Sequence, residues 1–308
     1  MNSTALASGP TPVANQQPVV RRLSPALGAE VTNFDITRCT DADFEVIFKA
    51  WIDANGVLVI RDANMTPAQH IEFASRFGVP AGVKRDPNSI LAQYYHPEHP
   101  QVYRVSNKSI GGLPIGREDA GTYWHSDGST SPTPSRCSLL HALEIPPYGG
   151  DTQFASLAMA YDALSDTMKR MLDGLQAVHS LANTIAAGNK TSYGKEFEGD
   201  KLDQAMAKNA THPVVRLLPD SGRKCLFVNP GFTSHIVGMH AEESAAILKF
   251  LFAHTVQPEF VYRHRYALND LVIWDNRSAM HYAVSDYKSY GTRYMHRVSI
   301  KGEAPVAA

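Results

Sequence analysis

The sequence predicts a mainly β protein with flanking helices, organised as a β-sandwich or barrel-like core. Two observations support this: many short strand-like segments bounded by turn residues, and helical periodicity confined to a few segments. The 308-residue chain is long enough for one large β-rich domain, and neither an internal repeat nor a linker divides it. We therefore expect one domain over residues 21–308. Residues 1–20, dominated by Pro, Ser, Asn and Gln, predict a disordered tail.

Two helices are expected near the start of this domain. Residues 41–56 place apolar side chains on one helical face and end at a glycine, and the apolar segment 57–60 then predicts a buried strand. Residues 66–78 predict a second helix, with Thr66 as its N-cap and Pro67 at its first helical position. These elements predict helices packed on a sheet.

Two long segments lack a clear period and are candidates for functional loops. Residues 79–100 are rich in Pro, Gly and polar groups and contain Tyr94 and Tyr95. In residues 181–212 Asn, Lys, Gly and Ala dominate, and this segment is a candidate lid. We expect both segments to border a binding pocket, where Tyr94 or Tyr95 contacts the bound molecule. The alternative, that both tyrosines only anchor their loop, stays open.

The rest of the chain alternates strands with a few helices. SRCSLLHALEIP and DTQFAS predict strands on either side of the turn PPYGG, and residues 156–175 predict two short helices capped by Ser156 and Ser165. Residues 241–255 predict a further helix. Additional strands are expected in HPVVRLL, KCLFVN, EFVYRHRY, DLVIWD and TRYMHRVSI.

Composition favours a small-molecule partner. With 29 basic and 30 acidic residues, the formal net charge is −1, which does not attract nucleic acid or an anionic membrane, and no long apolar run predicts a membrane span. Cys39, Cys137 and Cys225 are isolated, which argues against a disulfide framework or a thiolate zinc site. The first twenty residues lack the features of a secretory signal. We therefore expect a cytoplasmic protein.

A candidate metal site begins in TYWHSDGST, which places His125 and Asp127 two residues apart. Residues i and i+2 of an extended segment point the same way, so an imidazole and a carboxylate could bind one ion. The alternative is a surface strand entering a turn. His281, which follows the strand ending in WD, is the candidate third ligand, although only folding can bring it close. Two histidines and one carboxylate describe a non-haem Fe(II) site with open positions for a cosubstrate and O₂.

The last predicted strand supplies two candidate anion-binding groups. In TRYMHRVSI, strand alternation places Arg293, Met295 and Arg297 on one face. The two arginine Cα atoms would lie about 13 Å apart, so each is suited to its own anion. Fe(II), one carboxylate ligand and a dicarboxylate cosubstrate together carry one negative charge, which Arg293 can neutralise. The charge of Arg297 would then be balanced by an anionic substrate. The alternative is an arginine ladder on an exposed edge strand.

These motifs together amount to a family resemblance. WHSD, PPYGGDT, WDNR followed by a histidine, and RYMHR occur in this order. They resemble the Fe(II)/2-oxoglutarate-dependent dioxygenases of the taurine dioxygenase family, which includes the 2,4-dichlorophenoxyacetate dioxygenase. The similarity extends over nearly the whole chain, from roughly residue 23 to residue 300. It implies an oxidoreductase with a double-stranded β-helix, or jelly roll, that uses Fe(II), 2-oxoglutarate and O₂.

The resemblance also implies a role for individual residues at matching positions. Iron would be bound by His125, Asp127 and His281. Thr152 and Arg293 would hold the distal carboxylate of 2-oxoglutarate, while Arg297 would meet the anionic group of the substrate. We interpret Trp274 as a wall of the barrel rather than a reacting group.

The resemblance implies hydroxylation of a small anionic organic substrate, coupled to decarboxylation of 2-oxoglutarate to succinate and CO₂. LFVNPGFTSHIVG and FLFAHTVQPEF resemble the taurine enzymes, so taurine or another alkyl sulfonate or sulfate is expected. EFVYRHRY and AYDAL resemble the aryloxyacetate enzymes, and an aryloxyalkanoate or other carboxylate is the alternative. Outside this class, a zinc hydrolase or a non-catalytic binding protein stays open. A homo-oligomer is also expected.

Overall fold

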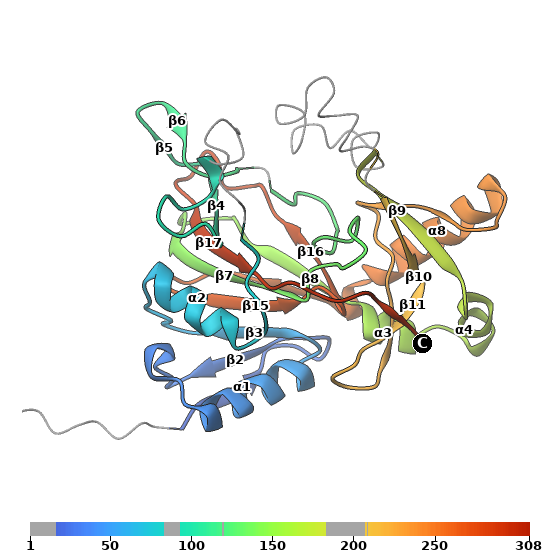
Figure 1. Ribbon diagram of the computed structural model, residues 1–308, viewed down its shortest axis with the longest axis horizontal. Helices are drawn as coiled ribbons and strands as arrows, with labels where there is room; N and C mark the ends of the chain where they lie inside the picture. Colours follow the sequence, from blue (N-terminus) through green and yellow to red (C-terminus); the bar gives the residue numbers. More distant parts are fainter. Residues whose placement is uncertain (1–16, 83–92, 119, 183–206, 208) are drawn as a thin grey trace, which may run out of the picture.

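The structure, a computed structural model, describes residues 17–82, 93–118, 120–182, 207 and 209–308 (Figure 1). This part of the chain is mainly β, with several sheets and few helices, as the sequence predicts. The longer helices are α1 (Asp41–Asp53), α2 (Pro67–Ser75), α3 (Leu157–Asp162), α4 (Asp166–Leu172) and α8 (Ala241–Thr255). None of the described helices has the length and apolar content needed to cross a membrane.

The largest sheet has seven strands in the order β1-β2-β3-β15-β7-β17-β4. Its neighbours pair antiparallel except β2 and β3, which are parallel. The strands are β1 (Val19–Arg22), β2 (Ala29–Thr32), β3 (Val57–Ile60), β15 (Leu271–Asp275), β7 (Cys137–Glu144), β17 (Tyr294–Ser299) and β4 (Val102–Ser106). Strands β3 and β15 are buried along their whole length, because other elements cover both faces of the sheet.

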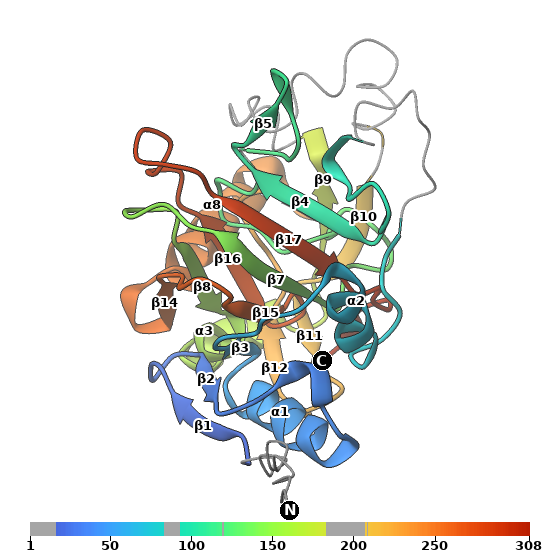
Figure 2. The ribbon, with the colours of Figure 1, turned by 90° about the vertical axis from the view of Figure 1, so that its left-hand side faces the viewer.

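Four smaller sheets complete the described β structure, and Figure 2 shows β8 and β16 beside the large sheet. The three-stranded sheet β14-β8-β16 contains β14 (Val261–His264), β8 (Thr152–Ser156) and β16 (Ala279–Ala283). A second, β10-β9-β13, contains β10 (Asn209–Pro213), β9 (Gln176–Ser180) and β13 (Thr233–Ile236). The others are β12-β11-β18, with β12 (Lys224–Leu226), β11 (Val215–Leu217) and β18 (Val306–Ala307), and the hairpin β5 (Ser109–Ile110) with β6 (Leu113–Pro114).

Two hydrophobic layers flank the large sheet. On one side α1 and α2 pack against it, and the rings of Trp51 and Phe77 meet edge to face at 5.3 Å. On the other side a second layer joins the large sheet to β8 and β16, with Phe154 5.7 Å from Trp274 and Met295 fully buried beside them. This second layer contains Phe154 and Trp274, whose rings also contact His281.

The predicted helix caps are confirmed. The Thr66 side chain accepts a hydrogen bond from the backbone of Gln69, and Pro67 opens α2. Ser156 and Ser165 accept the corresponding bonds at the starts of α3 and α4. Each side-chain oxygen satisfies a backbone N–H that the first helical turn leaves unpaired, so local sequence is sufficient to set these helix starts.

The last strand starts later than predicted. β17 begins at Tyr294, so Arg293 precedes it, and the pairing of β17 with β7 shifts between Tyr294 and Met295. Arg293 is nevertheless only 3% exposed, which rules out the surface arginine ladder at this position. HPVVRLL, predicted as one strand, forms β10 and β11 in two different sheets.

Regular structure also starts earlier than expected. β1 includes residues 19 and 20 of the predicted tail, because these residues pair with β2. The remainder of the tail, residues 1–16, lies outside the described residues. Most of the candidate lid, residues 183–206 and 208, lies outside them too, and the end of that segment belongs to β10.

A buried ion pair lies at the end of β15. The Arg277 side chain is 3% exposed and donates to both carboxylate oxygens of Asp275, at 2.9 and 2.8 Å. It also contacts the carboxylate of Asp220. Removing one member of such a pair leaves an uncompensated charge away from water, which costs more than the pair contributes.

We expect Arg277→Met to lower the free energy of unfolding by about 3–5 kcal/mol, because Asp275 would remain buried without its partner. Chemical denaturation followed by circular dichroism measures this change. Arg170→Met, at an exposed position on α4, is the matched control. A loss of less than about 1 kcal/mol for Arg277→Met would show that the pair behaves like a surface ion pair.

Candidate active site

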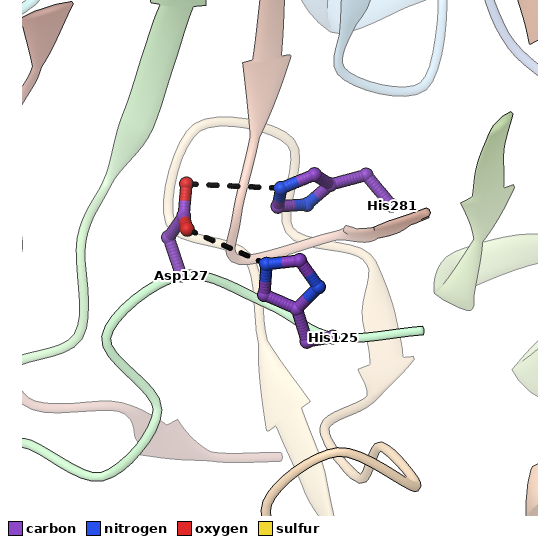
Figure 3. A group of neighbouring side chains, drawn as sticks. All are labelled: His125, Asp127 and His281. Carbon is purple, nitrogen blue, oxygen red and sulfur yellow. Dashed lines mark ion pairs between the residues drawn. The ribbon is translucent and has the colours of Figure 1, made fainter. Parts of the chain in front are cut away.

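The predicted metal-ligating side chains meet in the structure. His125, Asp127 and His281 each direct a ligand atom toward a common point, and these atoms lie within 4.8 Å of one another (Figure 3). The Nε2 atoms of His125 and His281 lie 3.7 and 3.9 Å from the carboxylate oxygens of Asp127. Both histidines are buried, and 13% of the Asp127 side chain is exposed. Folding therefore assembles the cluster that the motif predicts.

An isolated antiparallel bridge, which joins His125 to His281 on β16, positions the cluster. The backbone N–H of His125 donates to the carbonyl of His281 at 3.1 Å, and the N–H of His281 donates back at 2.9 Å. Asp127 lies in the turn that follows. The turn brings the carboxylate to face both imidazoles, whose ring centroids are 4.1 Å apart.

Both histidines present Nε2 to the centre of the cluster. Nδ1 of His125 lies 2.8 Å from the carbonyl oxygen of Tyr123, and donating to this oxygen leaves Nε2 with a free lone pair. Nδ1 of His281 is buried with no hydrogen-bond partner among the described residues. Burial and the neighbouring His125 lower the pKa of His281 well below its ordinary value, so its imidazole is neutral, as a metal ligand must be.

Asp127 is held by a polar network that sequence reasoning missed. The hydroxyl of Ser138 on β7 donates to Oδ2 of Asp127 at 2.8 Å. The backbone N–H of Asp127 donates to the Asn276 side-chain oxygen at 3.2 Å. Asn276 in turn donates to Ser138 and accepts from the Trp274 indole. The WDNR motif contained this signal, because Asn276 directly follows the strand predicted in DLVIWD. The network fixes the carboxylate before any ion binds.

Arg297 lies next to this carboxylate. Its Nη1 is 3.3 and 3.4 Å from the two oxygens of Asp127, and its guanidinium lies 5.0 Å from the ring centre of Tyr103. Burial raises the pKa of Asp127, but the opposing effects, first among them the nearby charge of Arg297, are together larger, and this pKa lies well below its ordinary range. Asp127 is therefore ionised, and Arg297, predicted to meet a substrate anion, stands at the edge of the ligand cluster.

Arg293 occupies a separate environment. Its Nε donates to the carbonyl of Gly150 at 3.0 Å, and its guanidinium lies 5.4 Å from the ring centre of Tyr266 and 5.8 Å from that of Tyr287. Gly150 has a φ of +73°, and a Cβ there would lie 3.0 Å from the Arg293 Cδ. This close approach explains the second glycine of PPYGGDT. The two arginines thus have different partners, as their predicted spacing suggested.

Thr152, the other residue predicted to hold the cosubstrate, is buried at the start of β8. Its hydroxyl lies 2.9 Å from the hydroxyl of Tyr266. Tyr266 therefore contacts both Thr152 and Arg293. A cavity of about 290 Å³ opens beside them, lined in part by Tyr266, Gly150 and Met295.

Tyr94 and Tyr95 pack around Tyr103, with ring centres 6.3 and 5.1 Å from it. Tyr95 also forms a backbone bridge with Tyr103, so both tyrosines anchor their loop to β4. Burial raises the pKa of Tyr95, while the nearby charge of Arg297 opposes this effect, which places Tyr95 on the Arg297 side. Contact of either tyrosine with substrate stays a prediction.

The residues present fit a divalent metal ion. Two imidazoles and an ionised carboxylate face one point, and a facial set of two histidines and one carboxylate is the donor set of non-haem Fe(II) oxygenases. The same two carboxylate oxygens of Asp127 also accept hydrogen bonds from Ser138 and Arg297. The fold and the site together define an oxygenase class with a β-rich core.

Comparison with known proteins establishes the family. The model described as "Taurine catabolism dioxygenase TauD, TfdA family" matches residues 20–299, and the chain belongs to this family. The alpha-ketoglutarate-dependent 2,4-dichlorophenoxyacetate dioxygenase of Cupriavidus pinatubonensis is 33% identical over 85% of this chain and 91% of its own length. A putative alpha-ketoglutarate-dependent sulfonate dioxygenase of Schizosaccharomyces pombe is 31% identical, over 93% of this chain and 70% of its own.

The structural comparison agrees. The crystal structure of a taurine dioxygenase from Burkholderia xenovorans superimposes with a TM-score of 0.76 and 31% identity, over 95% of this chain and 92% of that one. The chain is therefore an oxidoreductase, a dioxygenase that depends on Fe(II), 2-oxoglutarate and O₂, as the motifs predicted. The zinc hydrolase and the non-catalytic binding protein are set aside.

We expect Ser138→Ala to weaken metal binding by about tenfold or more, because Asp127 would lose the hydrogen bond that orients it. Anaerobic titration with Fe(II), or titration with Mn(II) by calorimetry, measures the dissociation constant. Ser106→Ala is the matched control, since Ser106 is equally buried but bonds the backbone of Lys108. Equal metal affinity in Ser138→Ala and the wild type would show that the hydrogen bond does not orient the ligand.

Proposed function

We propose that this dioxygenase hydroxylates a small organic anion, taurine or another alkyl sulfonate or sulfate, while 2-oxoglutarate is decarboxylated to succinate and CO₂. The observation that carries this proposal is the position of Arg297, whose guanidinium lies beside the ligand cluster with 22% of its side chain exposed. We also assign the core as a double-stranded β-helix. The packing of β14-β8-β16 on the seven-stranded sheet supports this assignment.

In this proposal His125, Asp127 and His281 hold Fe(II). Support comes from the converging Nε2 and carboxylate atoms, the neutral His281 and the ionised Asp127. Fe(II) held by these residues would, together with 2-oxoglutarate, supply O₂ activation. The protein contributes fixed ligand orientation through Ser138 and excludes water with the buried layer beneath the site.

Thr152 and Arg293 are assigned to the distal carboxylate of 2-oxoglutarate. Arg293 is buried, and its Nε and aromatic neighbours fix the guanidinium before the ligand arrives. Because the guanidinium of Arg293 is already oriented, little of the binding free energy of a carboxylate is lost in ordering the arginine side chain. Arg293 also balances the second negative charge of the cosubstrate, so the buried anion is not left unpaired.

Arg297 is assigned to the anionic group of the substrate. In the structure it contacts Asp127, but a carboxylate that also ligates a divalent cation cannot fully neutralise it. One positive charge is then available beside the metal position, and a sulfonate, sulfate or carboxylate would balance it. This places the charged end of the substrate near the ligands and fixes the distance of its carbon chain from the metal.

An aryloxyalkanoate is the second candidate substrate. The aromatic group formed by Tyr94, Tyr95 and Tyr103 favours it, because Tyr103 lies against the Arg297 guanidinium and the other two rings pack on Tyr103, which offers aromatic neighbours to an aryl group. The relative from Cupriavidus pinatubonensis, a 2,4-dichlorophenoxyacetate dioxygenase, supports the same class. The cytoplasmic location and the homo-oligomer stay predictions from the sequence.

The two arginines should divide the two ligands between them. We expect Arg293→Ala to raise the KM for 2-oxoglutarate at least about thirtyfold, since truncating one partner of a buried charge pair costs about 2 kcal/mol or more. Arg297→Ala should mainly raise the KM for the substrate. Steady-state succinate formation with each ligand varied in turn measures both values. Equal effects of both substitutions on both ligands would contradict the division.

Substrate class can be decided by succinate release. Anaerobically reconstituted Fe(II) protein is exposed to O₂ and 2-oxoglutarate with taurine, other alkyl sulfonates, alkyl sulfates or aryloxyacetates. We expect alkyl sulfonates or sulfates to accelerate succinate release, and Arg297→Ala to abolish the acceleration. Acceleration by aryloxyacetates alone would select the second candidate. Slow release that no compound accelerates would reject both classes.

A further inference from the structure

Tyr266 joins the two residues assigned to the distal carboxylate of 2-oxoglutarate. It lies just beyond the end of β14, where His264 is the cross-strand partner of Thr152. Its hydroxyl is 2.9 Å from the Thr152 hydroxyl, and its ring centre is 5.4 Å from the guanidinium carbon of Arg293. The side chain is buried, and the ring borders the cavity that Gly150 and Met295 also line.

The two hydroxyls form a donor that neither provides alone. Each carries one proton, and only one of the two protons is used in the bond between Thr152 and Tyr266. Whichever hydroxyl donates, the other keeps an O–H that can donate to an anion. Burial raises the pKa of Tyr266, although the charge of Arg293 opposes this, so the phenol remains protonated. A hydroxyl donor next to an arginine side chain is suited to bind a carboxylate.

The ring of Tyr266 also fixes Arg293. A guanidinium over an aromatic face is attracted to it, and Tyr287 lies on the same guanidinium at 5.8 Å. With Nε bonded to Gly150, the orientation of the fork is set by three contacts. Removing the ring would therefore loosen the arginine as well as delete the hydroxyl.

A buried network holds the Tyr266 ring in turn. His264 meets the ring edge to face at 4.6 Å, and its Nε2 lies 3.1 Å from the carboxylate of Asp270. Arg61 donates to the same Asp270 oxygen at 2.7 Å, and the Tyr262 hydroxyl lies 3.0 Å from Nδ1 of His264. Tyr266 is thus supported on the side away from Thr152, as a binding residue needs to be.

We propose that Tyr266 is a binding residue of the cosubstrate site: its hydroxyl, paired with Thr152, donates to the distal carboxylate of 2-oxoglutarate, and its ring positions Arg293. This rests on the proposed function, which assigns Thr152 and Arg293 to that carboxylate. It adds a third residue to the site and predicts that discrimination between 2-oxo acids depends on Tyr266.

The test compares two 2-oxo acids, with and without a distal carboxylate. Mn(II)-loaded protein is titrated with 2-oxoglutarate and with 2-oxobutyrate by calorimetry, so no turnover is needed. We expect Tyr266→Phe to weaken 2-oxoglutarate binding about tenfold and to leave 2-oxobutyrate binding unchanged, since a hydrogen bond to a charged group is lost. Tyr266→Leu should weaken 2-oxoglutarate further, because Arg293 also loses its aromatic contact.

Tyr161→Phe is the matched control, because Tyr161 on α3 also lies under a cation, that of Lys169, but belongs to a different hydrophobic cluster. Unchanged 2-oxoglutarate binding in Tyr266→Phe would overturn the assignment of Tyr266. Equal loss of both acids would also overturn it, since it would show a general effect on the pocket. Failure of the wild-type protein to bind 2-oxoglutarate would overturn the proposed function itself.

Discussion

The reciprocal backbone hydrogen bonds between His125 and His281 are the constraint on which the site depends. They join the segment that contains His125 to β16, although the two are far apart in the sequence. The imidazole ring centroids of His125 and His281 then lie 4.1 Å apart. Backbone hydrogen bonds of this kind do not depend on the side-chain rotamer, so they fix the Cα position from which each imidazole extends. Asp127 only has to complete a pair that already exists. Every other feature of the site acts on this preformed geometry.

The second requirement is to keep a buried carboxylate ionised. Burial alone would favour the protonated form of Asp127, which cannot serve as a ligand of the same kind. Arg297 and the Ser138 hydroxyl stabilise the anion instead. The same low-dielectric surroundings make an unpaired arginine costly, so the charge of Arg297 is balanced by Asp127 in the structure and calls for an anion when a metal shares that carboxylate. Metal binding and substrate charge are linked through this one contact.

Stability and function share one short stretch, WDNR at the end of β15. Trp274 packs 4.7 Å from the His281 ring, and Asn276 bonds the backbone of Asp127. Asp275 and Arg277, the other two residues of the motif, form the buried ion pair. The four consecutive residues are thus divided between the site and the structural core. Trp274 itself is buried in the hydrophobic layer beneath the site.

The sequence by itself determined the helix starts, the mainly β class and the identity of the metal-ligand candidates. These follow from local chemistry: Thr66 and Ser156 cap helices through their own side chains, and His125, Asp127 and His281 are the donor types that Fe(II) takes. Tertiary structure decided what surrounds them. Arg297 contacts Asp127, Tyr266 bonds to Thr152, and β17 shifts its register against β7 before Met295. Each of these pairings brings together segments that are distant in the chain. No local pattern specifies them, because they depend on how separate sheets pack.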